Sequence, residues 1–134
     1  VSLPTRRSRV RPPLPAPIKK MSDLLNKKCV PCEGGLKPFD ISEIHKYQKK
    51  IDDWDVVKND KEIFFLEKKF NFKDFLESQK FTNEVGKISE LEGHHPDISY
   101  GWGYAKITIL THAIEGLSEN DFILAAKIDK IISA

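Results

Sequence analysis

The sequence contains no apolar run long enough to cross a lipid bilayer. A membrane-spanning helix needs about 20 consecutive apolar residues, and no segment of the 134 residues approaches that length. The sequence also has no internal repeat and no glycine-rich phosphate loop, because Gly-Trp-Gly at 101–103 lacks the spacing of a dinucleotide fingerprint. These absences exclude a transmembrane protein, a repeat array and the common nucleotide-binding loops.

Cysteine is scarce, since the only two lie in a Cys-Val-Pro-Cys motif at residues 29–32. A structural zinc site needs about four ligands, and there is no second cysteine pair. A thioredoxin-like motif opens a helix, whereas Glu-Gly-Gly follows here at 33–35 and favours a turn. We therefore expect a loop with two reduced thiols, with redox regulation or adventitious metal binding as the alternatives.

Acidic residues are missing from the first 20 positions. Five of the eight prolines lie before residue 18, together with six basic side chains in residues 1–20: Arg6, Arg7, Arg9, Arg11, Lys19 and Lys20. Proline removes a backbone donor and arginine resists burial, so this segment is not expected to join a core. We predict a disordered, basic and proline-rich leader at 1–20 and a single domain at 21–134. The leader fits a tag or upstream read, a transit segment, or a basic arm that contacts a partner.

The rest of the chain is mildly acidic. Without the six basic residues of the leader, 16 basic residues remain against 20 acidic ones, a net charge of −4. A nucleic-acid-binding domain usually presents a basic face. We therefore expect no nucleic-acid or membrane partner, and a cytoplasmic location, or an organelle if residues 1–20 are a transit segment.

Apolar periodicity predicts a first helix and a hairpin. Ile41, Ile44 and Ile51 recur at helical spacing and predict a helix of roughly three turns that ends near residues 52–53. Residues 54–57 indicate a short strand. The run 63–72 then alternates, with one set of alternate positions apolar: Phe64, Leu66, Phe70 and Phe72. Alternation with one polar face is typical of an antiparallel strand.

Helical spacing returns between residues 73 and 91, interrupted by Gly86, which costs about 1 kcal/mol relative to alanine. Gly93 follows as a possible C-cap. We expect a loop from 94 to 103 and a strand region from 104 to 112, one face of which carries Ala105, Ile107, Ile109 and Thr111.

A last helix follows residue 116. Ser118 and Asp121 resemble a capping box at its start. The order is thus helix, two strands, helix, one or two strands, helix. We predict an α+β domain with a single antiparallel β-sheet and helices packed on one face, in the order α-β-β-α-β-β-α.

Three of the four histidines lie at predicted element ends. His94 and His95 are adjacent at a helix-to-loop junction, and His112 ends the next strand. A strand that returns antiparallel beneath the helix brings His112 back towards the pair. Glu90 lies four residues before His94, so we expect both on one helical face, where the carboxylate fixes an imidazole tautomer.

Imidazoles titrate near neutral pH, so such a cluster can hold one ring as an acid and another as a base. No serine or cysteine nucleophile with a nearby base is evident. Three histidines can also hold zinc or iron. A purely structural explanation stays open too, in which His94 caps a helix, His95 is solvated and His112 merely ends a strand.

Three further residues are candidates for supporting roles. Asp121 is either a fourth member of the histidine cluster or a helix-terminal carboxylate favoured by the helix dipole. Trp102 and Tyr104 are either candidates to stack on a flat heterocyclic substrate or surface aromatics without that role. Five phenylalanines are expected in the core: Phe64, Phe70, Phe72, Phe75 and Phe81.

The run Glu-Leu-Glu-Gly-His-His-Pro-Asp at 90–97, followed by Thr-His at 111–112 and Gly-Leu-Ser-Glu-Asn-Asp at 116–121, resembles the signature of pterin-4a-carbinolamine dehydratases. Cys-Val-Pro-Cys-Glu-Gly-Gly at 29–35 is similar to the start of many microbial members. Animal members have a tryptophan soon after His-His-Pro, whereas this chain has Ile98 there and its tryptophan at 102.

The resemblance implies dehydration of 4a-hydroxytetrahydropterin to quinonoid dihydropterin, which recycles tetrahydrobiopterin for aromatic amino-acid hydroxylases. It implies that His94 and His95 protonate the departing hydroxyl, and that His112 binds the pterin or accepts a proton from the ring. Glu90 and Asp121 would orient imidazoles. It further implies no metal or nucleotide cofactor, a homodimer or homotetramer, and a functional link to a phenylalanine hydroxylase.

Two other classes of function remain open. Some animal relatives are dimerisation cofactors of a transcription factor, so a binding role without catalysis is one alternative. A histidine-coordinated metal protein is the other.

Overall fold

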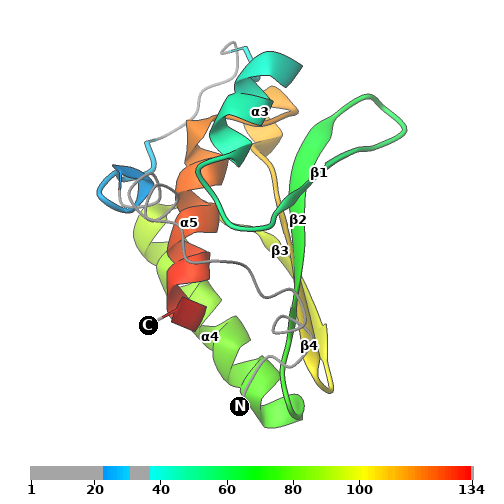
Figure 1. The fold of residues 1–134 in the computed structure, drawn as a ribbon, viewed down its shortest axis with the longest axis vertical. Helices are drawn as coiled ribbons and strands as arrows, with labels where there is room; N and C mark the ends of the chain where they lie inside the picture. The colour runs from blue at the N-terminus through cyan, green and yellow to red at the C-terminus, as the bar shows by residue number, and fades with distance from the viewer. Residues whose placement is uncertain (1–22, 31–36, 134) are drawn as a thin grey trace.

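A computed structural model describes residues 23–30 and 37–133 of the chain. The predicted leader at 1–20 and Cys32 lie outside these residues. The model contains a four-stranded antiparallel sheet with helices on one side (Figure 1). The predicted α+β class and the element order are confirmed. No helix in the described part of the chain is long and apolar enough to span a membrane.

The elements follow the chain as α3 (Ile41–Gln48), β1 (Asp55–Lys58), β2 (Phe64–Asn71), α4 (Phe75–Glu92), β3 (Asp97–Gly101), β4 (Tyr104–Ile109), the short 3-10 helix η1 (His112–Ile114) and α5 (Glu119–Ser133). The strands are ordered β1-β2-β4-β3. Strand β4 therefore lies inside the sheet, with Phe70 opposite Ala105 on one side and Ile98 opposite Ile107 on the other. In Figure 1, α4 and α5 lie side by side against this sheet.

Three boundaries differ from the expectations. Helix α3 ends at Gln48, earlier than the three turns that were predicted, although Asp40 caps its start with Glu43 in a capping box. Residues 97–101 form β3 where a loop was expected. Strand β4 ends at Ile109, so His112 lies in η1 and not at a strand end.

The core lies between the inner face of the sheet and α5. On β4 the predicted inner residues are all buried, including Ala105, Ile107 and Ile109 at 0% exposure. Helix α5 is apolar around most of its circumference and is buried accordingly from Phe122 to Ala126. Its sequence needs this cover, since a helix that is apolar all round is stable only when it is surrounded.

One charged pair is buried in this core. Lys68 lies on the inner face of β2, among apolar neighbours, and its Nζ is 2.8 Å from Asp129 Oδ1 of α5. Asp129 Oδ2 also accepts a hydrogen bond of 2.9 Å from Trp54 Nε1. Burial raises the pKa of the Asp129 carboxyl, while the Lys68 charge and the Trp54 N–H oppose that rise. The ion pair therefore joins the sheet to α5, and each of the two buried charges compensates the other.

We predict that Lys68→Ala lowers the free energy of unfolding by about 3–5 kcal/mol at neutral pH, because Asp129 is left as an uncompensated buried charge. Without Lys68 the pKa of Asp129 rises further, so protonation at acid pH relieves the charge and the gap to the wild type narrows as the pH falls. Urea unfolding at pH 7 and pH 4.5 measures both effects.

The neighbouring exposed Lys69 provides the matched control. Lys69→Ala removes a surface charge and is expected to change the free energy of unfolding by about 0.5 kcal/mol or less. Equal losses in the two variants would show that the buried pair contributes nothing specific.

Candidate active site

The end of α4 sends two neighbouring histidines in different directions. Gly93 has a φ of 66°, in the left-handed region that glycine adopts without strain, and closes the helix as a C-cap. Its N–H donates to Glu90 O, and the His94 N–H donates to Ser89 O. His94 and His95 therefore leave the helical path, and the expectation that Glu90 and His94 share a helical face is wrong.

His94 faces α5 and binds a buried carboxylate. Its Nε2 is 2.7 Å from Asp121 Oδ1, and the exposed fractions of the two side chains are 13% and 0%. The second oxygen of Asp121 accepts hydrogen bonds from Thr111 Oγ1 at 2.7 Å and from the Ser118 N–H at 2.8 Å. Asp121 thus binds the histidine and also supplies the carboxylate half of the predicted capping box at the start of α5.

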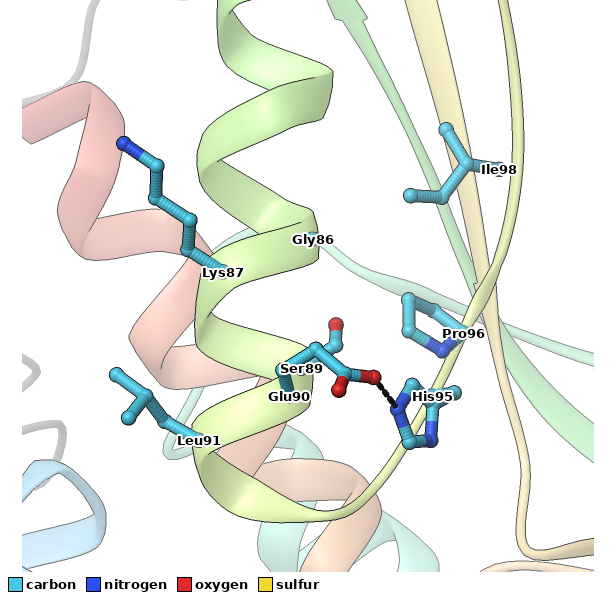
Figure 2. Close-up of a pocket in the computed structure, with 8 residues that line it drawn as sticks. All are labelled: Gly86, Lys87, Ser89, Glu90, Leu91, His95, Pro96 and Ile98. Atoms are coloured by element: carbon cyan, nitrogen blue, oxygen red, sulfur yellow. Dashed lines mark hydrogen bonds and ion pairs between the residues drawn. The ribbon is translucent and has the colours of Figure 1, made fainter.

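His95 forms the second pair, with Glu90. Its Nε2 is 2.6 Å from Glu90 Oε2, and the exposed fractions are 59% for His95 and 78% for Glu90. Solvent screens this pair strongly, so it orients the ring more than it stabilises the fold. Figure 2 shows the two side chains pointing toward each other from the end of α4 and the segment that leads into β3.

The two pairs fix the same tautomer. An ionised carboxylate can only accept a hydrogen bond, so the Nε2 of each imidazole carries the hydrogen in the pair. In both rings the remaining nitrogen, Nδ1, is then the atom that can give or take a proton. A carboxylate that holds one ring nitrogen in this way is the arrangement that prepares histidine for general acid–base chemistry.

An open groove of about 750 Å³ lies beside the second pair (Figure 2). Its walls come from α4 and from the start of β3, and the lining residues are Gly86, Lys87, Ser89, Glu90, Leu91, His95, Pro96 and Ile98. The volume is within the range of small-molecule sites. A Cβ added at Gly86 would meet no atom within 4 Å, so the absent side chain leaves this part of the groove open.

His112 lies close in the chain to the first pair but is not joined to it. It follows Thr111, a donor to Asp121, and begins the exposed η1 turn. This turn is closed at its base, where the Thr111 N–H donates to Gly116 O at 2.8 Å. Within residues 37–133, no hydrogen bond connects the His112 ring to the other two imidazoles.

The two candidate stacking aromatics lie apart from the histidines. Strand β3 starts two residues after His95 and runs away from it, so Trp102 lies in the turn at the far end of the β3–β4 hairpin. Trp102 is 72% exposed, and Tyr104 follows it at the start of β4. The structure therefore does not bring either aromatic to the groove within one chain.

The described part of the chain offers no set of ligands for the metal site that was considered as an alternative. No group of three or more histidine, cysteine, aspartate or glutamate side chains could hold a metal ion there. Cys29 is a buried free thiol, and burial, reinforced by the nearby Glu92 carboxylate, raises its pKa to about 12. A thiol with that pKa is not a nucleophile at neutral pH.

Sequence reasoning missed the role of Thr111 as a donor to Asp121, whereas the bond from the Ser118 N–H belongs to the predicted capping box. A signal was present at Thr111, which continues the alternation of Ala105, Ile107 and Ile109 just beyond the end of β4. A buried hydroxyl needs a hydrogen-bond partner, so a polar residue in that position indicates a nearby acceptor. The structure also places Asn120 and Glu92 beside the site, and no periodic pattern marks either of them.

Fold and site together define a small α+β protein that carries two histidine–carboxylate pairs at the end of one helix. The sequence pattern of the family described as pterin 4 alpha carbinolamine dehydratase matches residues 37–131. The chain belongs to this family, which confirms the resemblance seen in the sequence.

Relatives from several bacteria agree with this assignment. A provisionally named pterin-4-alpha-carbinolamine dehydratase of Rubrobacter xylanophilus is 43% identical over 83% of this chain and 100% of its own length. A protein of Alkaliphilus metalliredigens with the same provisional name is 47% identical, over 82% of this chain and 96% of its own.

Solved structures share the fold. A transcriptional coactivator/pterin dehydratase from Brucella melitensis matches with a TM-score of 0.64 and 26% identity, over 71% of this chain and 98% of that one. A pterin dehydratase-like RuBisCO assembly factor of the alpha-carboxysome matches with a TM-score of 0.52 and 24% identity, over 62% and 93% of the two chains. The second likeness concerns the fold alone.

Proposed function

We propose that this protein dehydrates 4a-hydroxytetrahydropterin to quinonoid dihydropterin and so recycles tetrahydrobiopterin for an aromatic amino-acid hydroxylase. The reaction breaks the bond between C4a and the hydroxyl, which leaves as water, and removes the proton from the neighbouring ring nitrogen. It needs one acid and one base, and no oxidant or reductant. Family membership supports this chemistry.

The observation that carries the proposal is that two consecutive histidines each have Nε2 held by a carboxylate. His95 lines the open groove, so its Nδ1 is the group best placed to protonate the departing hydroxyl. His94 is the second acid, held by the buried Asp121. Glu90 and Asp121 act as positioning residues that fix the tautomer of each ring.

His112 is proposed as the group that binds the pterin or accepts the proton from the ring nitrogen. Its chain neighbour Thr111 shares the Asp121 carboxylate with His94, so the backbone of His112 starts close to the first pair. Its exposure in η1 leaves the imidazole available to a ligand. Trp102 and Tyr104 are proposed to contact the substrate from a second copy of the chain, whose β3–β4 turn would lie at this groove.

Replacing His95 and His112 together by alanine is expected to lower kcat/KM by a factor on the order of 10² or more, because the acid that lines the groove and the proposed base are both removed. The rate is measured with reduced pterin generated by phenylalanine hydroxylase, in the presence of a metal chelator. Activity that survives the chelator separates acid–base catalysis from the metal alternative.

The fourth histidine serves as the matched control. His45 is exposed on α3, outside the groove, and His45→Ala is expected to retain wild-type kinetics. Wild-type rates in the double variant would show that His95 and His112 take no part in the reaction. An inactive wild type that forms a stable complex with another protein would instead favour a binding role.

The groove itself can be tested at Gly86. The Cβ of Gly86→Leu enters open space, and the change improves helix propensity by roughly 1 kcal/mol, so the fold should be retained. If the pterin binds here, the leucine raises KM about tenfold and changes kcat little. Asn83→Leu, at an exposed position of α4 outside the groove, is the control, and an unchanged KM in Gly86→Leu would place the substrate elsewhere.

We also propose that the chain forms a homodimer or homotetramer. Strand β3 is an edge strand, and an unpaired edge readily binds another strand. The exposed apolar side chains Phe75, Tyr100 and Trp102 lie at the same end of the molecule. Light scattering of the purified protein is expected to give a multiple of the chain mass, and the mass of one chain at assay concentration would contradict the proposal.

A further inference from the structure

A short segment that precedes residue 37 packs beside the His94–Asp121 pair. Residues 23–30 precede the matched region of 37–131 and are partly buried, with exposed fractions of 1% for Leu24 and 8% for Cys29. The contacts of residues 28–30, named here the strap, fall on the last turn of α4 and the first turn of α5. These are the two helix ends that carry His94 and Asp121.

The strap binds the end of α4 through two hydrogen bonds. The Cys29 N–H donates to Glu92 Oε1 at 2.9 Å, and Lys28 Nζ donates to Leu91 O at 2.8 Å. A lysine at a free carbonyl near a helix C-terminus is favourable, because it satisfies the acceptor and complements the helix dipole. His94 follows Glu92 by two residues, so these contacts hold the backbone from which its ring projects.

The strap binds the start of α5 through Asn120, whose side chain forms hydrogen bonds with both backbone polar groups of Val30. The Val30 N–H donates to Asn120 Oδ1 at 3.0 Å, and Asn120 Nδ2 donates to Val30 O at 2.6 Å. Asn120 is 4% exposed. The next residue is Asp121, so the strap holds the carboxylate side of the pair as well.

Glu92 closes the ring of contacts. Its second oxygen binds Lys127 of α5, so the carboxylate joins α4, α5 and the strap at one point. Burial alone would raise the pKa of Glu92, but the hydrogen bonds from Lys127 and Cys29 hold it below its ordinary value. Glu92 is therefore ionised at neutral pH and can hold both donors.

We infer that the strap is a positioning element of the active site, and that Asn120 sets the placement of the Asp121 carboxylate against His94 through its bonds to Val30. The inference rests on the proposed function for its effect on catalysis. His94 and Asp121 are 27 residues apart in the chain and meet at 2.7 Å. A shift of either helix end by about 1 Å takes these two atoms beyond hydrogen-bonding distance.

Two variants break the strap from opposite sides. Asn120→Ala removes its two side-chain hydrogen bonds to Val30. Val30→Pro removes the N–H that donates to Asn120 Oδ1 and leaves the sequence of α5 unchanged. We expect each to lower kcat about tenfold with KM altered less than twofold, and to shift the pH profile of kcat, because the acid is misplaced and not lost. Asn83→Ala, at an exposed position on α4, is the matched asparagine control.

Two further measurements do not depend on activity. In a Cys32→Ser background, alkylation of Cys29, the one remaining thiol, reports whether the strap has left its site. The side-chain NMR signal of the His94 Nε2 hydrogen reports whether the bond to Asp121 persists. We expect both variants to label Cys29 faster than the Asn83→Ala control does, and to lose or shift the His94 signal.

The outcomes separate the two proposals. A wild type without dehydratase activity overturns the proposed function, and the His94 signal then decides the strap by itself. Faster labelling of Cys29 with an unchanged His94 signal, kcat and pH profile overturns the strap inference while the dehydratase assignment stands. If Asn120→Ala does not fold, Val30→Pro carries the same test.

Discussion

A buried carboxylate determines how three parts of this protein meet. Asp121 has no exposed surface, and a charge removed from water must find donors inside the protein. Those donors are the His94 ring, the Thr111 hydroxyl and the Ser118 amide, which belong to the end of α4, the segment after β4 and the start of α5. Asp121 thereby joins the end of α4, the segment after β4 and the start of α5 at one place. The same hydrogen bond to Asp121 that compensates the buried charge also fixes the tautomer of His94.

The sequence predicted the fold well where hydropathy alone decides it. Alternation along β2 and β4 and helical spacing in α4 gave the α+β class and the element order. The sequence predicts a loop where β3 lies, because the five residues of β3 form a largely exposed edge without clear alternation. Lys68 could not be assigned either, since its burial depends on Asp129, a partner 61 residues later that no local pattern reveals.

Four of the predicted site residues form hydrogen-bonded pairs in the structure, although not the expected ones: His94, His95, Glu90 and Asp121. Among the described residues no hydrogen bond joins His112 to either pair, and Trp102 and Tyr104 lie apart from the histidines. Asp121 binds one imidazole and also accepts from the Ser118 N–H at the start of α5. The pairings depend on the left-handed turn at Gly93, which places His94 against α5 and leaves Glu90 to His95. A helical wheel cannot describe residues beyond the helix end, so the expected pairing of Glu90 with His94 failed there.

The closed base of the η1 turn separates residues that hold the fold together from side chains that are exposed to solvent. Thr111 and Gly116 pair with each other, and a side chain at position 116 would collide with Pro38 at 2.6 Å. Thr111, which forms this base, and Ser118, which follows it, both donate hydrogen bonds to the buried Asp121 carboxylate. The side chains of His112 and Glu115 are exposed on the outer loop. The architecture behind this loop therefore depends on Thr111, Gly116 and Ser118, and not on the side chains that are exposed at its tip.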